Sequence, residues 1–308
     1  MRLSSDAVSV LLVPDVGARI VSLRDRRTGR EWLTTGAPPS AGELAGWAAE
    51  DAAFDGRASF GWDECLPTVG VCADPLDGGA EPLRDHGEQW GRKAPSSLDQ
   101  SAAAIHTVWP ASRWDYVFSR RLSLRDATTL LVEYRLDNTS SVAMPLLWSL
   151  HPCLRLEPGS RIELPSVDTV MVTAASGIDL QAGLASWPHA DLVTTSSDAD
   201  VPVVDLSRVR SGEGWATKLY AEAPTAVRAV TPDGASLSID WDRAFAPSLG
   251  IWLAYGGWPV EGAPVEQLAL EPTTSGHDDL AGALRDGAEC VLQPGASLDW
   301  WVSIQLDV

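Results

Sequence analysis

Hydrophobic and polar side chains alternate with a period of two along several segments of the chain. The clearest runs cover residues 130–137, 236–241 and 300–307, where every second side chain is apolar. Successive side chains of a β-strand point to opposite faces, so each run would bury one face and leave the other to solvent or a cleft. Such alternation is typical of antiparallel sheets and predicts an all-β protein.

Further apolar runs have the length and composition of strands. They cover residues 8–13, 18–23, 116–124, 142–150, 218–221, 226–230, 249–255 and 266–270. Clusters of turn-forming residues separate the runs, for example at 137–140, 157–160 and 232–234. This spacing predicts a large β-sandwich.

Helix signals are few. Residues Gly42–Asp51 are predicted to hold a short helix, and Ser275–Gly287 have the capping residues and apolar spacing of a two-turn helix. Three irregular stretches remain, at residues 36–63, 73–100 and 174–214. The last is the longest, and loops of that length inside a domain are often lids or binding loops. No interdomain linker is recognisable, which favours one domain.

Composition and charge exclude several classes of function. The 308 residues include 42 acidic and 23 basic side chains, for a formal net charge of -19. Such a field repels phosphate backbones and anionic lipids, so we expect neither a nucleic-acid nor a membrane partner. No apolar run approaches the ~20 residues that span a bilayer, and the N-terminus does not resemble a signal peptide. The four cysteines form no C-x-x-C pair, and we expect a cytoplasmic protein with reduced thiols.

Tryptophan is unusually frequent, with 14 residues against 4 tyrosines and 4 phenylalanines. Indole faces pack well on the C–H faces of sugars, so this composition favours a carbohydrate ligand. A core rich in tryptophan explains the same numbers, and composition alone leaves both interpretations open.

Two histidines stand in positions that suit polar chemistry. His86 lies in the polar segment Asp85–Trp90, which is either part of a ligand site or a surface loop. His151 closes an apolar run and precedes Pro152, which favours an extended backbone and a side chain that projects from a strand end. A titratable group there needs partners, as a ligand-binding or as a core histidine.

Carboxylates provide a third candidate position. Glu271 ends an apolar run and precedes Pro272, and burial there would raise its pKa toward the range of a general base. A simple strand exit explains the same pattern. Asp63 and Glu64 form a second acidic position among apolar residues, where a turn at a strand edge is the alternative. His151 and Cys153 lack a third ligand at a recognisable spacing, so no metal site is predicted.

Taken together, these motifs resemble the aldose 1-epimerase (galactose mutarotase-like) superfamily along nearly the whole chain. Pro14–Leu23 is similar to the opening hairpin of that family, and His86 followed by Gly is similar to its first active-site histidine. His151 matches the second histidine, Leu270–Pro272 the catalytic Leu-Glu-Pro, and Pro294–Trp300 the C-terminal motif. The resemblance implies one large antiparallel β-supersandwich over residues 1–308, with a sugar site on a concave sheet face.

The resemblance also implies a mechanism. Glu271 would take the proton from the C1 hydroxyl of an aldose, and His151 would protonate the ring oxygen. His86 would orient the substrate by a hydrogen bond. An imidazole pKa near 6.5 provides a usable acid fraction at neutral pH. The reaction needs no metal and no organic cofactor.

The sequence departs from galactose-specific members at the ligand. Phe60–Pro67 replaces their Asn-Arg-Ile motif, Gly214–Leu219 replaces the segment with a sugar-binding Asp, and His151 lacks the usual preceding Asn. These departures indicate a divergent branch. Lys218 is expected to meet a sugar acid, a sugar phosphate or a neighbouring carboxylate, unless it is an ordinary exposed strand lysine.

The remaining predicted substrate contacts are Trp90 and Trp252, as sugar platforms, together with Asp63 and Glu64. We therefore expect a small carbohydrate ligand and a mutarotase, with monomer and homodimer both open. Two other functions remain: another sugar isomerase, epimerase or lyase on the same scaffold, and a carbohydrate-binding module without catalysis.

Overall fold

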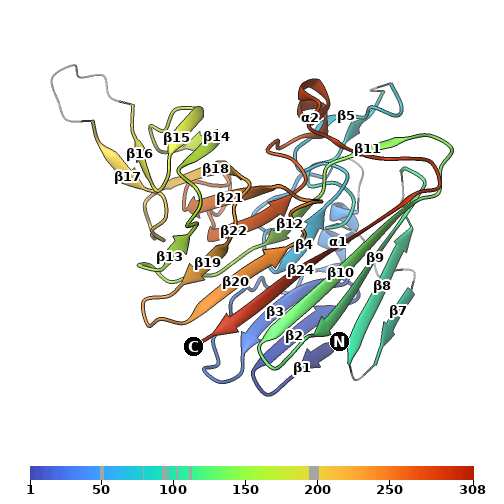
Figure 1. Ribbon diagram of the computed structural model, residues 1–308, viewed down its shortest axis with the longest axis horizontal. Helices are drawn as coiled ribbons and strands as arrows, with labels where there is room; N and C mark the ends of the chain where they lie inside the picture. Colours follow the sequence, from blue (N-terminus) through green and yellow to red (C-terminus); the bar gives the residue numbers. More distant parts are fainter. Residues whose placement is uncertain are drawn as a thin grey trace.

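The computed structural model describes residues 1–48, 52–78, 80–91, 95, 97–101, 103–110, 113–193 and 201–308. Two large antiparallel sheets form the body of the molecule (Figure 1). The first has the order β1 (Arg2–Ser4), β2 (Val8–Val13), β3 (Arg19–Asp25), β4 (Trp62–Cys65), β12 (Ser149–Pro152), β22 (Glu266–Thr273), β21 (Ser248–Tyr255), β18 (Trp215–Glu222), β14 (Thr169–Ser176) and β15 (Gly183–Ser186). The second has the order β13 (Arg161–Glu163), β19 (Val227–Val230), β20 (Ser236–Trp241), β24 (Ser297–Asp307), β10 (Thr129–Asn138), β9 (Tyr116–Leu124), β8 (Ala104–Pro110) and β7 (Ser97–Gln100).

The three alternating runs form antiparallel strands, as predicted, and these strands belong to the second sheet. In β10, Leu130, Val132, Tyr134 and Leu136 are buried, while the charged side chains between them are exposed. β10 pairs with β9 and β24 over nearly its whole length. The buried faces of both sheets contribute to one large apolar core. The all-β antiparallel sandwich predicted from the sequence is therefore confirmed.

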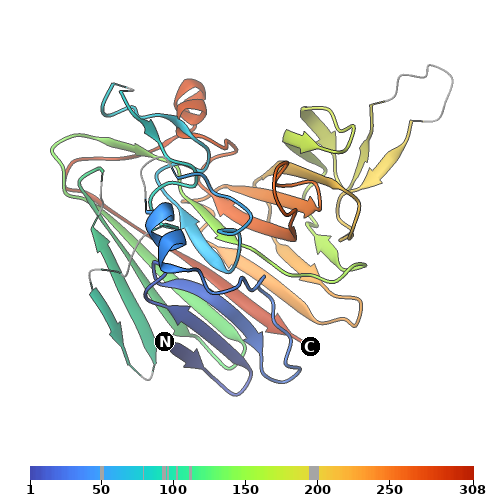
Figure 2. The same cartoon turned by 180° about the vertical axis from the view of Figure 1, so that it is seen from behind.

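The central strands of the first sheet are buried on both faces. β12 is buried throughout, as is nearly all of β18, β21 and β22. One face packs on the core, and loops cover the other. Figure 2 shows α1 (Ala41–Trp47) and the blue and cyan loops around it in front of this sheet. Polar side chains on these strands therefore enter a covered space and not bulk solvent.

Both predicted helices are present. α1 begins after Ser40, which forms a capping box with Glu43. Residues 49–51 of the predicted helix lie outside the described residues. α2 (Leu280–Asp286) is capped by Asp279 and ends at Gly287, whose φ of 64° is the left-handed conformation that favours glycine at this position.

The predicted strand 142–150 is two short strands. β11 (Met144–Leu146) pairs with β23 (Cys290–Leu292) in a separate small sheet, and β12 belongs to the ten-stranded sheet. Between them, the backbone amides of Leu147 and Trp148 donate to Pro67 and to the hydroxyl of Thr274. Hydrogen bonds to loops thus interrupt a run that hydrophobicity alone makes continuous.

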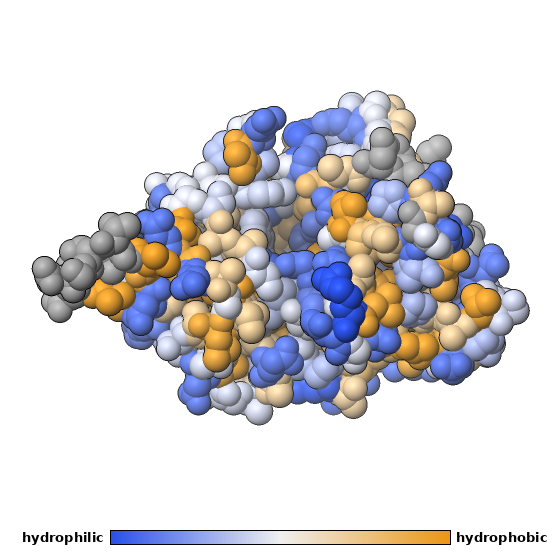
Figure 3. All heavy atoms as spheres, turned by 90° about the horizontal axis from the view of Figure 1, so that it is seen from above, coloured by the Kyte–Doolittle hydropathy of each residue, from blue (hydrophilic) through white to orange (hydrophobic). Residues whose placement is uncertain are grey.

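The described residues of the long stretch 174–214 form a projecting arm and not a loop over the cavity described below. It contains β15, β16 (His189–Asp191) and β17 (Val203–Asp205), and it extends away from the body (Figure 1). Apolar side chains, among them Val193, Val201 and Val203, are exposed along it (Figure 3). In the arm, β16 pairs with β17 in a small sheet, and elsewhere β5 (Cys72–Ala73) pairs with β6 (Pro82–Leu83).

Two sequence predictions about environment can be compared with the structure directly. In the described residues, no helix has both the length and the apolar character needed to cross a bilayer. All four cysteines are free, and three of them are buried.

Candidate active site

A cavity of about 340 Å³ lies on the covered face of the central strands. Strands supply one part of its wall, and the loops around residues 54–59, 69–70, 85–86 and 258 supply the other. The lining residues are Phe54, Ser59, Val69, Gly70, Asp85, His86, His151, Ala174, Lys218, Trp252, Trp258, Glu271 and Asp278. Ala174 is the one residue of the projecting arm among them.

Lys218 and Glu271 meet across an intervening strand. In the sheet register, Gly250 of β21 stands opposite Glu271 of β22, and Lys218 of β18 stands opposite Trp252 of β21. The Lys218 ammonium donates to Glu271 Oε2 in a short, buried ion pair. A Cβ atom on Gly250 would lie 2.9 Å from that oxygen and 3.3 Å from Lys218 Nζ. The bare backbone of Gly250 therefore leaves the space in which the two charges meet.

The second oxygen of Glu271 is buried and has no hydrogen-bond partner among the residues that the structure describes. A buried acceptor without a donor is costly, so this oxygen is poised to accept a hydrogen bond from a ligand in the cavity. Burial lowers the pKa of Lys218, but the carboxylates of Glu271 and Asp278 outweigh that effect and raise it. The ammonium thus stays charged beside Glu271.

The sequence suggested that Glu271 stands at a strand end, but in the structure it lies within β22. β22 continues through Pro272, which stands opposite Leu249, to Thr273. Strand pairing therefore fixes the backbone on both sides of the carboxylate. The Glu271 side chain therefore projects from a strand that has a neighbouring strand on each side.

His86 is held by its neighbours from several directions. Its backbone has a φ of 57°, an uncommon conformation for a residue other than glycine. Its ring stacks on Phe54, with 3.9 Å between centroids. Its Nδ1 lies 2.8 Å from Asp85 Oδ1. Asp85 is itself anchored, since its Oδ2 accepts from the Phe54 amide and its carbonyl accepts from the indole of Trp90.

The charges around Asp85 keep it ionised. Burial raises the pKa of this carboxyl. The His86 ring and the backbone amide of Phe54 lower the pKa by more than burial raises it, so it lies below its usual value. An ionised Asp85 orients the Nδ1–H of His86 toward itself. Nε2 is then the ring nitrogen available to a ligand.

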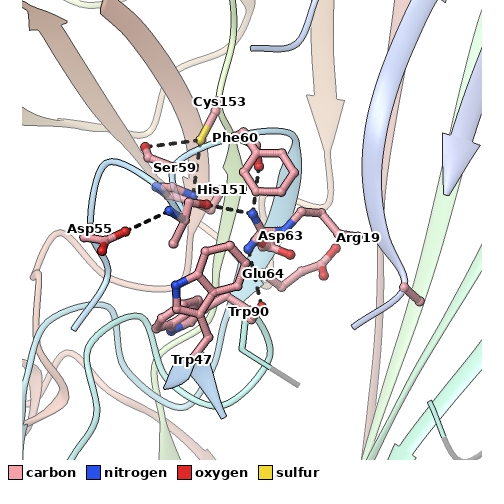
Figure 4. A network of polar contacts seen from close by, with 12 residues as sticks. Arg19, Trp47, Asp55, Ser59, Phe60, Asp63, Glu64, Trp90, His151 and Cys153 are labelled. Carbon is pink, nitrogen blue, oxygen red and sulfur yellow. Dashed lines mark hydrogen bonds and ion pairs between the residues drawn. The ribbon is translucent and has the colours of Figure 1, made fainter. Parts of the chain in front are cut away.

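His151 faces His86 edge-on, with 4.9 Å between ring centroids. It stands on β12 opposite Asp63 of β4, and its Nδ1 lies 3.9 Å from the sulfur of Cys153 (Figure 4). Burial, together with the positive charges of His86, Lys218 and Arg19, holds the pKa of His151 well below its usual value. His151 is therefore neutral at neutral pH, in contrast to the usable acid fraction expected from the sequence.

Asp63 and Glu64 do not line the cavity, and both carboxylates form buried ion pairs. Asp63 pairs with Arg19 in a short contact, and Glu64 accepts from Arg120 at 3.0 Å and from the Tyr134 hydroxyl at 2.9 Å. Burial raises the pKa of Asp63 to about 7, more than the attraction of Arg19 lowers it. Figure 4 shows Asp63 with its partner Arg19.

The structure brings together five of the eight residues that the sequence singled out. His86, His151, Lys218, Trp252 and Glu271 line the cavity. Asp63, Glu64 and Trp90 do not, because buried partners occupy the two carboxylates and Trp90 is only 1% exposed beneath the loop.

Sequence reasoning missed several lining residues. Phe54, Asp85, Trp258 and Asp278 all face the cavity, and Trp258 packs edge-on against Trp252 at 5.8 Å. Asp85 was adjacent to a recognised histidine, which is a usable signal. The glycine at 250 inside an apolar strand is another, because such a glycine often marks a close approach.

The donor set does not resemble a metal centre. Among the residues that the structure describes, no group of three or more His, Cys, Asp or Glu side chains could hold a metal ion. The cavity instead combines a carboxylate, two imidazoles and an ammonium with aromatic walls. This set suits proton transfer to and from a small polar ligand.

Comparison with known proteins identifies the fold. No family model matches the chain, and no curated protein matches it. Among solved structures, a galactose mutarotase-like protein from Clostridium acetobutylicum is similar with a TM-score of 0.65 and 15% identity, over 99% of this chain and 94% of that one. A GalM/aldose epimerase homologue from C. elegans has a TM-score of 0.62 and 12% identity, over 100% and 98%.

A third structure, the Slr1438 protein from Synechocystis sp. PCC 6803, has a TM-score of 0.70 and 14% identity, over 100% of this chain and 95% of that one. The chain therefore has the galactose mutarotase-like fold that the sequence motifs suggested. At these identities the likeness defines the fold, and function has to be argued from the cavity.

Proposed function

We propose that the protein is an aldose 1-epimerase-like mutarotase, an isomerase that interconverts the anomers of a monosaccharide. The observation that carries this proposal is that Glu271, which has one buried oxygen without a partner among the described residues, lines the same small cavity as His86 and His151. The cavity volume of about 340 Å³ lies at the lower end of the ~300–1,000 Å³ range of ligand sites. The fold of the mutarotase-like proteins supports the same reaction.

The reaction consists of two proton transfers and a rotation. The Glu271 carboxylate takes the proton from the C1 hydroxyl, and an imidazole gives a proton to the ring oxygen as the bond from C1 to that oxygen breaks. The open-chain aldehyde turns about C1–C2 and closes on its other face, with both proton transfers reversed. Each positioned acid or base typically contributes ~10²–10⁴-fold to the rate.

The charges of the cavity favour a sugar without an acidic group. Lys218, the residue expected to meet a phosphate or a carboxylate, is already paired with Glu271. Asp85 and Asp278 add two further carboxylates to the wall. An anionic sugar would therefore meet more negative than positive charge, whereas a neutral aldose fits, with Trp252 and Trp258 offering aromatic surface to its C–H faces.

Saturation-transfer NMR between anomer signals, across a panel of neutral and anionic aldoses, tests the proposal. Wild-type protein is expected to enhance exchange of at least one neutral aldose, and Glu271→Gln is expected to lose ~10²–10⁴ of that rate because the amide cannot act as a base. Glu266→Gln is the matched control, since Glu266 is an exposed carboxylate on the same strand. Sugar binding without exchange would indicate a binding module and overturn the proposal.

A further inference from the structure

The two imidazoles of the cavity have different surroundings. His151 has no carboxylate within ion-pair distance in the part of the chain that the structure describes, and its Nδ1 approaches only the thiol of Cys153. Burial raises the pKa of that thiol to about 12, so it is neutral and cannot balance a positive ring. A proton on His151 would therefore be unsupported.

His86 has the support that His151 lacks. The carboxylate of Asp85 bonds to its Nδ1 at 2.8 Å, Phe54 stacks on its ring, and the amide of Phe54 fixes the second oxygen of Asp85. The strained backbone at φ 57° is held by a hydrogen bond from the His86 amide to the carbonyl of Val69. Strain maintained at a cavity in this way points to function.

We infer that, in the mutarotation proposed above, the Asp85–His86 pair delivers the proton to the ring oxygen, and that His151 acts as a neutral hydrogen-bonding group. His86 Nε2–H gives its proton to the ring oxygen as the bond to C1 breaks, while Glu271 takes the proton of the C1 hydroxyl. After closure, both protons return. The cycle therefore leaves the protein unchanged and needs no other reactant.

Charged groups from every side of the cavity bear on this proton. Asp85 supports it from the same loop, and Asp278 before α2 adds negative charge across the cavity. Lys218 opposes it, but the ammonium is neutralised by its ion pair with Glu271. Among the charged groups around the cavity, the one in direct contact with the His86 ring is therefore a carboxylate.

Asp85→Asn separates the two candidate acids, because it keeps the shape of the side chain and removes its charge. Loss of the acid proton sets the alkaline limb of the rate profile. We expect this limb to move to lower pH, because an amide in contact with the ring does not stabilise its charged form as a carboxylate does. His151→Gln is the control and should lower the rate without moving the limb.

His86→Gln is expected to reduce kcat by ~10²–10⁴, more than His151→Gln does, with a smaller change in KM. The inference is overturned if the alkaline limb disappears in His151→Gln and stays in place in Asp85→Asn.

A second measurement does not depend on turnover, and so separates this inference from the proposed function. Nitrogen-15 NMR of the imidazoles, recorded against pH on the full-length protein, reports which ring binds a proton first as the pH falls. We expect His86 to do so before His151, and at a lower pH in Asp85→Asn. Protonation of His151 before His86 would overturn the inference, whether or not any aldose is a substrate.

Discussion

Among the polar side chains that line the cavity, three stand on strands, and the neighbouring Asp85 and His86 stand on one loop. His151, Lys218 and Glu271 belong to β12, β18 and β22, whose backbones are fixed by pairing on both sides. Asp85 and His86 are fixed instead by side-chain hydrogen bonds, ring stacking and a left-handed backbone.

The strand group and the loop group differ in what a substitution does to them. A strand holds a side chain in place even when its neighbours change, so substitutions in the strand group act mainly through charge. The loop has no such support, and its geometry depends on a few contacts. The proposed reaction would therefore combine a carboxylate fixed on a strand with an imidazole whose position depends on local contacts.

The largest effect is expected where a charge in the strand group loses its partner. Lys218→Met leaves the Glu271 carboxylate buried without its counter-ion, and breaking such a pair costs about 3–5 kcal/mol in the free energy of unfolding. Urea denaturation measures this loss. The double variant Lys218→Met/Glu271→Gln should recover part of it, because no charge is then stranded. A single variant as stable as wild type would show that the pair contributes nothing.

A methyl group should break the loop group while the strand group stays intact. Gly87 has a φ of 66°, and a Cβ there would lie 2.1 Å from the carbonyl oxygen of Leu66. Gly87→Ala should therefore displace His86, with a loss of stability of about 1–3 kcal/mol and a lower rate of anomer exchange.

Gly78→Ala provides the comparison for that variant. Gly78 has a similar φ of 73°, but nothing lies within 4 Å of the added atom. Denaturation midpoints and exchange rates of the two variants isolate the contact with Leu66 from the cost of the backbone conformation. Equal effects in both would show that this contact does not position the loop.

The smallest effect concerns the pH dependence of stability at His151. Its pKa in the folded protein is well below the ordinary value, so below about pH 6.5 the unfolded chain binds a proton that the folded protein rejects. Stability is therefore complete above pH 6.5 and decreases as the pH falls. Between pH 7.5 and 5.5 this contributes a loss of about 1.4 kcal/mol in wild type.

His151→Gln should lack that contribution, and the difference between the two proteins removes the effects of other titrating groups. Urea denaturation at pH 7.5 and 5.5 measures it. Identical slopes with pH in both proteins would mean that the buried ring accepts a proton readily.

The strand group was largely predictable from the sequence, because its signals are local. An apolar run that meets a single His or Glu before Pro identified both His151 and Glu271, and the period-two pattern identified the sandwich. What could not be predicted was the partner of Lys218. That contact depends on the register of three strands, which no local pattern contains.

The loop group and the lower side of the cavity were less predictable. Phe54 and Trp258 lie in irregular segments without periodicity, so nothing in the sequence places them at the cavity. Asp63 and Glu64 had the composition of a ligand site, but Arg19 and Arg120 arrive from distant strands and neutralise them. Local composition cannot distinguish a carboxylate awaiting a ligand from one already paired.

Because Gly250 has no side chain, the strand between Lys218 and Glu271 leaves room for their charged groups to meet. With alanine there, the ends of the Glu271 and Lys218 side chains would have to shift, although β21 could still pair with its neighbours. A substitution at position 250 would therefore change the contact between Lys218 and Glu271 from a strand that contributes neither charge.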